Sequence, residues 1–158
     1  MQPPHSPQAN PGSIRAPGST DHDGWLLLWK GYQAFYQVVI PDDVSQVTWS
    51  RLLNPAEPMH AALAFDDANR ALGLVHWLTH RSTWTTHDSC YLQDLFVASE
   101  ARGRGIGRRL IEHVYQQATV AGCARVYWLT HETNTTAMTL YDRMADRTGF
   151  VQYRRNLP

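Results

Sequence analysis

The residues with the clearest chemical meaning are four arginines that alternate with three glycines between positions 102 and 109 of this 158-residue chain. The run reads Arg-Gly-Arg-Gly-Ile-Gly-Arg-Arg and contains no acidic residue. Glycine lets the backbone turn and approach a ligand closely, and the first amides of a helix are unpaired donors at its positive end. Together these features bind anions. We therefore expect this run to hold a phosphorylated ligand.

Two well-known phosphate motifs do not fit the run. A dinucleotide fingerprint needs G-x-G-x-x-G/A and an acidic residue about 20 positions later, but its third position falls on Arg108 and no acid lies around residues 123–128. A Walker loop needs Gly-Lys-Ser/Thr, whereas Gly107 is followed by two arginines. What remains is the spacing R-x-x-G-x-G, with Arg102, Gly105 and Gly107 at a predicted junction between a strand and a helix.

The elements that position this run are predicted from hydrophobic periodicity and turn residues. Strands are expected at 14–16, 61–65, 71–79, 90–97, 125–130 and 150–154. A first helix is expected to be capped by Asp23 and to run to Tyr36, and a second to follow Pro41-Asp42-Asp43 and run to Leu53. A third is expected to begin at Ile106 and end at Gly122, and a fourth to begin at Asn134 and end at Gly149. This order predicts an α/β (α+β) fold, with a mixed, mostly antiparallel central sheet and helices on both faces.

The amino-acid composition limits the classes of binding partner and the cellular compartment that we expect. Lys+Arg and Asp+Glu balance at 14 each, so no overall charge favours nucleic acid or an acidic membrane. No apolar run approaches the ~18 residues of a membrane span, and the first 20 residues resemble no secretory signal. We expect a cytoplasmic protein with a flexible tail at 1–12, a single domain at 13–158, and no nucleic-acid or membrane partner. Cys90 and Cys123 have no zinc spacing, so we expect inert thiols and no metal.

The R-x-x-G-x-G pattern at this position resembles the cofactor loop of the GNAT superfamily of acetyl-CoA-dependent N-acetyltransferases. Residues 91–97 followed by 101–107 look most like the diamine (spermidine/spermine) and histone-type members, and the resemblance is strongest over roughly residues 90–155. It implies a GNAT-like fold and acetyl-CoA as co-substrate. It also implies an acyltransferase that moves an acetyl group to a primary amine of a small molecule or peptide, by direct attack in a ternary complex.

The resemblance also assigns roles to residues. Family members carry an asparagine at the start of the next helix and a tyrosine seven residues later, and Asn134 and Tyr141 match both. Tyr141 would protonate the departing thiolate, since a phenol pKa of ~10 suits that task. Main-chain groups of the strand end would pair with the pantetheine, and amides of 103–108 would hold the pyrophosphate. The expected cofactor contacts are Leu95, Phe96, Val97, Arg102, Gly103, Arg104, Gly105, Ile106, Gly107, Arg108, Asn134 and Ala137.

The proton acceptor is less well defined by the sequence. Diamine acetyltransferases often place a glutamate before the aspartate of this strand, whereas here the position holds Gln93, which cannot take a proton. Asp94 is the nearest carboxylate, but alternation puts it on the opposite face from Gln93 unless a bulge intervenes. We expect Tyr141, Gln93 and Asp94 at the catalytic centre, with Asp94 either binding or deprotonating the amine or making a structural hydrogen bond.

Other residues and functions stay open at this stage. His76 and His80 are ~13 Å apart on a strand and are expected to be separate core or pocket residues rather than a metal pair. The aromatic side chains from Trp25 to Tyr36 are expected to pack the first helix onto the sheet. The alternative to an enzyme is a non-catalytic acyl-CoA-binding module, in which Gln93 reflects loss of the base. The last strand provides a possible homodimer contact.

Overall fold

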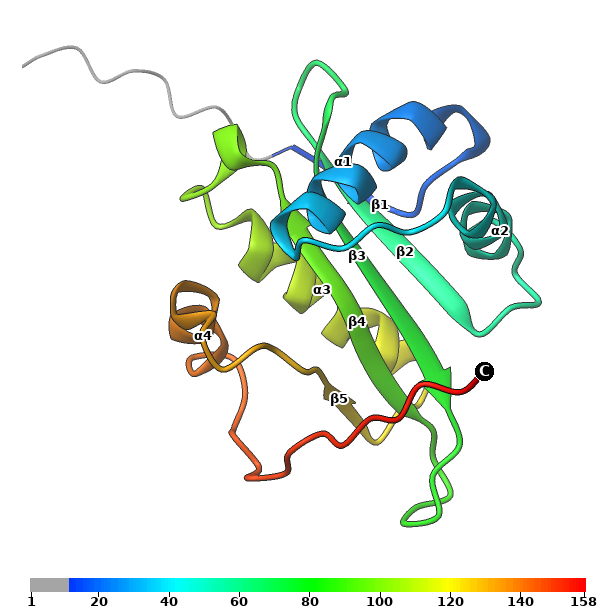
Figure 1. Cartoon of the computed structure of the whole chain (residues 1–158), viewed down its shortest axis with the longest axis vertical. Coiled ribbons are helices and arrows are strands. Elements are labelled where there is room, and N and C mark those ends of the chain that lie inside the picture. Colours follow the sequence, from blue (N-terminus) through cyan, green and yellow to red (C-terminus); the bar gives the residue numbers. More distant parts are fainter. Residues whose placement is uncertain (1–11) are drawn as a thin grey trace, which may run out of the picture. The chain divides into compact units, whose positions relative to one another are not determined.

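The structure is a computed structural model that describes residues 12–158 (Figure 1). The chain forms two compact units, one ending at Trp128 and one spanning Leu129–Pro158. The predicted tail lies outside the described residues except for Gly12, whose carbonyl accepts a hydrogen bond from Arg109 Nη2 at 2.8 Å. The predicted single domain at 13–158 stays a prediction.

The first unit contains a five-stranded sheet with the order β1-β2-β3-β4-β5. Its strands are β1 (Ile14–Arg15), β2 (Met59–Phe65), β3 (Ala71–His80), β4 (Ser89–Val97) and β5 (Arg125–Tyr127). The first four strands pair antiparallel, and β5 runs parallel to β4. This confirms the predicted mixed, mostly antiparallel sheet.

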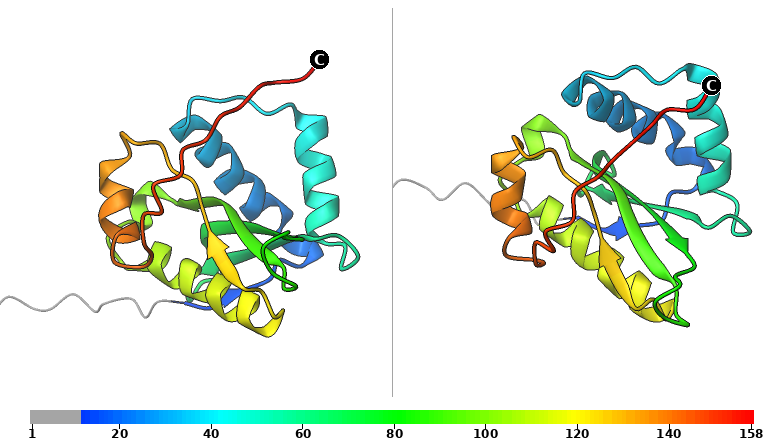
Figure 2. Two further views of the ribbon diagram at one scale, coloured as in Figure 1. Left: turned by 90° about the horizontal axis from the view of Figure 1, so that it is seen from below. Right: turned by 60° about the horizontal axis from the view of Figure 1, so that its bottom comes forward.

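The helices of the first unit lie on both faces of the sheet, also as predicted (Figure 2). They are α1 (His22–Phe35), α2 (Asp42–Leu52) and α3 (Ile106–Val120). His76 of β3 faces α1, where its ring lies 5.2 Å from that of Trp29. The next residue, Trp77, packs against His113 of α3 at 6.0 Å. Because neighbouring strand residues point to opposite faces, α1 and α3 cover opposite sides.

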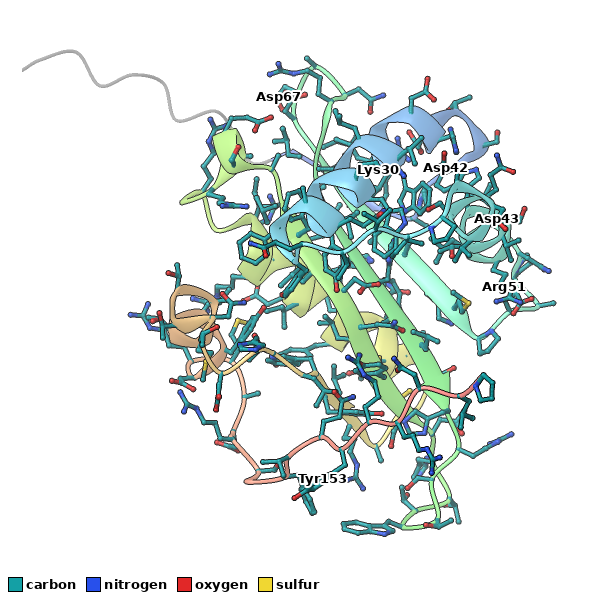
Figure 3. The ribbon with its side chains drawn as sticks, viewed as in Figure 1. Lys30, Asp42, Asp43, Arg51, Asp67 and Tyr153 are labelled. Carbon is teal, nitrogen blue, oxygen red and sulfur yellow. The ribbon has the colours of Figure 1, made fainter. Side chains whose placement is uncertain are left out.

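Helix α2 is fixed beside α1 by polar contacts at two depths. Inside, Trp29 Nε1 donates to Ser45 Oγ at 3.2 Å. At the surface, Lys30 Nζ donates to Asp42 Oδ1 at 2.8 Å, a pair visible in Figure 3. Exposed ion pairs contribute little to stability, so the buried indole contact is the stronger evidence that α1 and α2 are held together. The two helices therefore form one wall over the sheet, with α1 on β3 and β4 and α2 on β2.

A glycine brings α1 close to the strand that carries the predicted site. A Cβ added at Gly31 would lie 2.7 Å from Cε1 of Phe96 in β4. Phe96 packs against a core cluster that includes Trp25, Trp29 and Leu74. Any side chain at position 31 would therefore push α1 away from β4.

The last strand predicted from the sequence is wrong. Residues 150–154 form no strand, and among them Phe150, Val151 and Tyr153 are 75–93% exposed. A strand needs a paired neighbour, and the unit Leu129–Pro158, taken alone, contains none. Its helix α4 (Thr135–Tyr141) stops well before the predicted end at Gly149, because Arg147 folds back in two hydrogen bonds to Asp142 at 2.9 Å.

The remaining boundaries are close to those expected. Strand β5 ends at Tyr127 rather than at residue 130, since its pairing with β4 covers only three residues. The other elements differ from the predicted ends by no more than two residues. No helix in residues 12–158 has the length and apolar character needed to cross a membrane.

Candidate active site

The glycine run forms a tight loop that leads directly into α3. Gly103 and Gly105 have φ values of +77° and +72°, which lie in the left-handed region that glycine adopts without strain. The first intrahelical bond runs from the amide of Arg109 to the carbonyl of Gly105, at 3.1 Å. The amides of residues 106–108 precede that bond, so they have no helical acceptor. The loop thus has the donors that an anion site requires.

The arginines of the run are each tied to their own chain. The bonds are Arg102 Nε to the Val97 carbonyl at 3.1 Å, Arg104 Nη2 to the Glu100 carbonyl at 3.2 Å, Arg108 Nε to Glu112 Oε1 at 2.9 Å, and Arg109 Nη2 to the Gly12 carbonyl. A guanidinium has five N–H donors, so each keeps others for a ligand. Both the backbone amides and the remaining guanidinium donors are therefore available at this loop.

Beside this loop, β4 is paired along only part of one edge. Strand β5 pairs with Ser89–Tyr91, whereas β3 pairs with β4 along its whole length. Within residues 12–158, no strand pairs with residues 92–97 on the β5 side. Unpaired edge amides and carbonyls accept an extended ligand as an added strand. The predicted pantetheine contacts Leu95, Phe96 and Val97 all lie on this edge.

A bulge in β4 brings Gln93 and Asp94 to the same cavity. Asp94 pairs with His76 and Leu92 pairs with Trp77, so Gln93 has no partner in the ladder. A bulge of this kind interrupts the alternation of side chains. Both Gln93 and Asp94 line a cavity of about 210 Å³. The sequence indicated that Gln93 and Asp94 would face the same side only if a bulge intervened, and β4 contains that bulge.

The cavity lies between the α1–α2 wall and strands β2–β4. Its other lining residues are Trp29, Ile40, Val44, Thr48, Leu52, Met59, His60, His76, Trp77 and Leu78. Among the described residues that line it, Asp94 is the one acid, and none is lysine or arginine. A largely apolar cavity with one carboxylate suits a cationic group attached to a small body.

A second hollow is larger but contains none of the predicted site residues. It has a volume of about 470 Å³ and lies along α2 and the turn that follows it. Asp43 and Arg51, labelled in Figure 3, line it together with Glu57. Since no residue of β4 or of the glycine loop lines this hollow, we do not assign it to the reaction.

Asp94 is 7% exposed and is held by neighbours from β3 and α1. His76 Nδ1 lies 3.0 Å from Asp94 Oδ2, and Trp25 Nε1 donates to His76 Nε2 at 2.9 Å. Burial raises the pKa of Tyr32, and the charge of Asp94 and a hydrogen bond to it raise that pKa further. The sequence did not indicate that Trp25 and His76 interact at the site, because 51 residues separate them and no local pattern joins them.

In the second unit, the residues predicted to contact the cofactor and the residue predicted to protonate the thiolate share one helix face. Asn134 precedes α4 as its N-cap residue, and Tyr141 is its last residue. Asn134, Ala137 and Tyr141 are all partly buried and are spaced three and four residues apart, as on one helix face. Asn134 Nδ2 donates to Thr130 Oγ1 at 3.3 Å. His131 and Glu132, which shortly precede Asn134 in the chain, are exposed to solvent.

The thiols and potential metal ligands have limited chemistry. Burial raises the pKa of Cys90 to about 12 and also raises that of Cys123. The reactive form of cysteine is the thiolate, so neither thiol is an activated nucleophile at neutral pH. No group of three or more His, Cys, Asp or Glu side chains in the described part of the chain is arranged to hold a metal ion.

The five-stranded sheet, the glycine loop before α3 and the partly paired edge of β4 together are typical of a transferase that uses an acyl-coenzyme A donor. Residues 25–145 match the Acetyltransferase (GNAT) family. Because this match covers well over half of the chain, the chain belongs to that family, and the resemblance stated from the sequence is confirmed.

Relatives of known activity support the assignment. The chain is 39% identical over 144 residues to the D-amino-acid N-acetyltransferase HPA3 of Saccharomyces cerevisiae, covering 90% of this chain and 89% of that protein. It is 31% identical over 93 residues to the thialysine N-epsilon-acetyltransferase of Sus scrofa, covering 59% of this chain and 49% of that protein. Both relatives are N-acetyltransferases by name.

Solved structures confirm the fold. The aminoglycoside acetyltransferase AAC(6')-Iy, in complex with the bisubstrate analogue CoA-S-monomethyl-acetylneamine, superposes with a TM-score of 0.80 at 22% identity. The match covers 92% of this chain and 98% of that one. At this identity the similarity establishes the fold and not the acceptor.

Proposed function

We propose that the protein transfers the acetyl group of acetyl-CoA to a primary amine of a small molecule. One observation carries the proposal: β4 contains both the unpaired edge at residues 92–97 and, at the bulge, the carboxylate of Asp94. A donor lying along the edge and an amine bound in the cavity would meet at this strand. The activities for which the two relatives are named, on D-amino acids and thialysine, support small amines as acceptors.

The described residues fit acetyl-CoA as the donor. The amides of residues 103–108 would hold its pyrophosphate, with added charge from Arg102, Arg104 and Arg108. The edge at Leu95–Val97 would pair with the pantetheine, and Asn134 and Ala137 would contact the same arm. When bound, acetyl-CoA supplies an activated thioester carbonyl.

The reaction then needs one proton acceptor and one proton donor. The amine enters as an ammonium ion and loses a proton to Asp94, directly or through water held by Gln93. Its freed lone pair attacks the thioester carbonyl, the carbon–sulfur bond breaks, and Tyr141 protonates the departing thiolate. The new amide nitrogen and Asp94 each release a proton, and Tyr141 regains one from solvent, so the net products are the acetylated amine, CoA and one proton.

Turnover separates this enzyme from a non-catalytic acyl-CoA-binding module. We expect release of CoA, measured with a thiol reagent, to rise above hydrolysis with at least one amine from a panel of D-amino acids, thialysine, polyamines, aminoglycosides and lysine peptides. Tyr141→Phe should lower kcat by about 100-fold, while calorimetry shows unchanged binding of acetyl-CoA. Binding of acetyl-CoA with no amine-dependent release would instead establish the binding module.

Direct attack predicts sequential kinetics without an acetyl-enzyme. Neither cysteine is activated, so Cys123→Ala should keep the wild-type kcat, and initial-rate lines at several amine concentrations should intersect. Parallel lines, or protein mass increased by one acetyl group after incubation with acetyl-CoA alone, would require a covalent intermediate and rule out this mechanism.

We further infer a cytoplasmic homodimer. Free Cys90 and Cys123 are compatible with a reducing compartment. Phe150, Val151 and Tyr153 are 75–93% exposed, and aromatic side chains are enriched at interfaces between protein chains. These observations support a dimer contact at residues 150–154.

A further inference from the structure

A chain of three buried side chains runs from α1 through β3 to the bulge in β4. Trp25 is fully buried, and His76 and Asp94 are 4% and 7% exposed. Trp25 Nε1 lies 2.9 Å from His76 Nε2, and His76 Nδ1 lies 3.0 Å from Asp94 Oδ2. The three groups are therefore linked by two hydrogen bonds in a site largely shielded from water.

The direction of both hydrogen bonds follows from the chemistry of the indole. An indole N–H only donates, so His76 Nε2 must accept and carries no proton. The proton of the neutral imidazole is then on Nδ1, which donates to the carboxylate of Asp94. Trp25, which only donates, and the Asp94 carboxylate, which only accepts, thus favour the same tautomer of His76.

The surroundings leave the imidazole little freedom to change this arrangement. The ring of His76 packs edge-on against Trp29 at 5.2 Å, and the strand register places His76 directly opposite Asp94. The indole of Trp29 donates to Ser45, so it does not compete for His76. Tyr32 on α1 lies near Asp94, and burial together with the charge of Asp94 raises the pKa of this phenol.

We propose that Trp25 and His76 are positioning residues that hold the Asp94 carboxylate in one orientation for the acceptor amine. This role rests on the proposed function, because it matters for turnover only if Asp94 meets the amine. Trp25 and His76 act through Asp94 and need not touch the substrate. Without the N–H donor at Nδ1, the carboxylate would lose a hydrogen bond that fixes its orientation.

The tautomer is measurable in the unmodified protein. In ¹⁵N-labelled wild-type protein near neutral pH, we expect the His76 resonances, assigned by their loss in His76→Asn, to show a protonated Nδ1 and an unprotonated, hydrogen-bonded Nε2. Trp25→Phe should remove the hydrogen-bond signature at Nε2, whereas Trp29→Phe, which removes a neighbouring indole with a different acceptor, should preserve it. A protonated Nε2 in the wild type would overturn the proposal without reference to activity.

Two substitutions of His76 separate positioning from packing. Asparagine places an amide nitrogen near Nδ1 and can still donate to Asp94, whereas glutamine places its amide group near Nε2. We expect His76→Gln to lower kcat about tenfold relative to His76→Asn, which corresponds to one lost hydrogen bond. The KM for acetyl-CoA should be unchanged in both, and thermal unfolding shows whether each variant folds.

The outcomes distinguish this role from the proposed function. A wild-type protein without amine-dependent turnover removes both. A wild type that turns over, with equal kcat in His76→Asn and His76→Gln, overturns the positioning role and leaves the acetyltransferase in place.

Discussion

Replacement of Asp94 by asparagine is expected to lower kcat by about 100-fold or more, the usual range for loss of a general base. Asparagine preserves the shape of the side chain and still accepts the hydrogen bond from His76. It cannot take a proton or attract an ammonium ion. Steady-state rates at saturating acetyl-CoA and amine measure the effect, and the KM for acetyl-CoA should stay at its wild-type value because the proposed donor contacts lie along the edge of β4 and at the glycine loop.

The bulge provides an internal control for this prediction. Gln93 lines the same cavity as Asp94, so adding Gln93→Glu to Asp94→Asn returns a carboxylate to the site from the adjacent position. We expect the double variant to recover part of the lost kcat. Near wild-type kcat in Asp94→Asn alone would assign Asp94 the structural hydrogen-bond role that the sequence left open.

The elements of the proposed donor site were predictable because their signals are local. Apolar residues in a strand pattern, then glycines at R-x-x-G-x-G spacing, then a helical stripe from Ile106 indicate β4, the loop and α3 within about 30 contiguous residues. The glycine conformations agree, since Gly103 and Gly105 both have positive φ. Each of these features depends on its immediate neighbours in the chain.

The features around Asp94 depend on tertiary structure and were not predictable in the same way. The bulge at Gln93 arises from the register between β4 and β3, which alternation of residue types does not encode. The contact between Trp25 and His76 joins two elements through packing. The sequence identified each residue as a core or pocket residue but contained no signal that they were bonded to one another.

The predicted strand at 150–154 was wrong for a related reason. Phe150, Val151 and Tyr153 are residue types with high strand propensity, but strand propensity reflects a place in a sheet rather than an intrinsic backbone preference. The unit to which they belong, Leu129–Pro158, contains no paired strand among its residues. Composition alone therefore overestimated the regular structure at this end of the chain.

The second large effect is expected at the glycine loop, where Gly105→Ala should weaken CoA binding about tenfold or more, the loss of one charge-assisted hydrogen bond. Gly105 precedes α3 with φ of +72°, and an added Cβ meets no protein atom within 4 Å. The substitution therefore causes no clash within the fold. It penalises the left-handed backbone that directs the amides of residues 106–108 outward, and calorimetry with CoA measures the result.

Gly122 at the opposite end of α3 is a matched control for this substitution. Its φ is +73°, and an added Cβ again meets no protein atom within 4 Å. Alanine at either position should cost about 1–2 kcal/mol of stability through the same left-handed strain, so the two variants should unfold at similar temperatures. Only Gly105→Ala should lose affinity for CoA. Equal losses in both variants would assign the effect to weakening of α3 as a whole, whereas a loss confined to Gly105 places the pyrophosphate at the start of the helix.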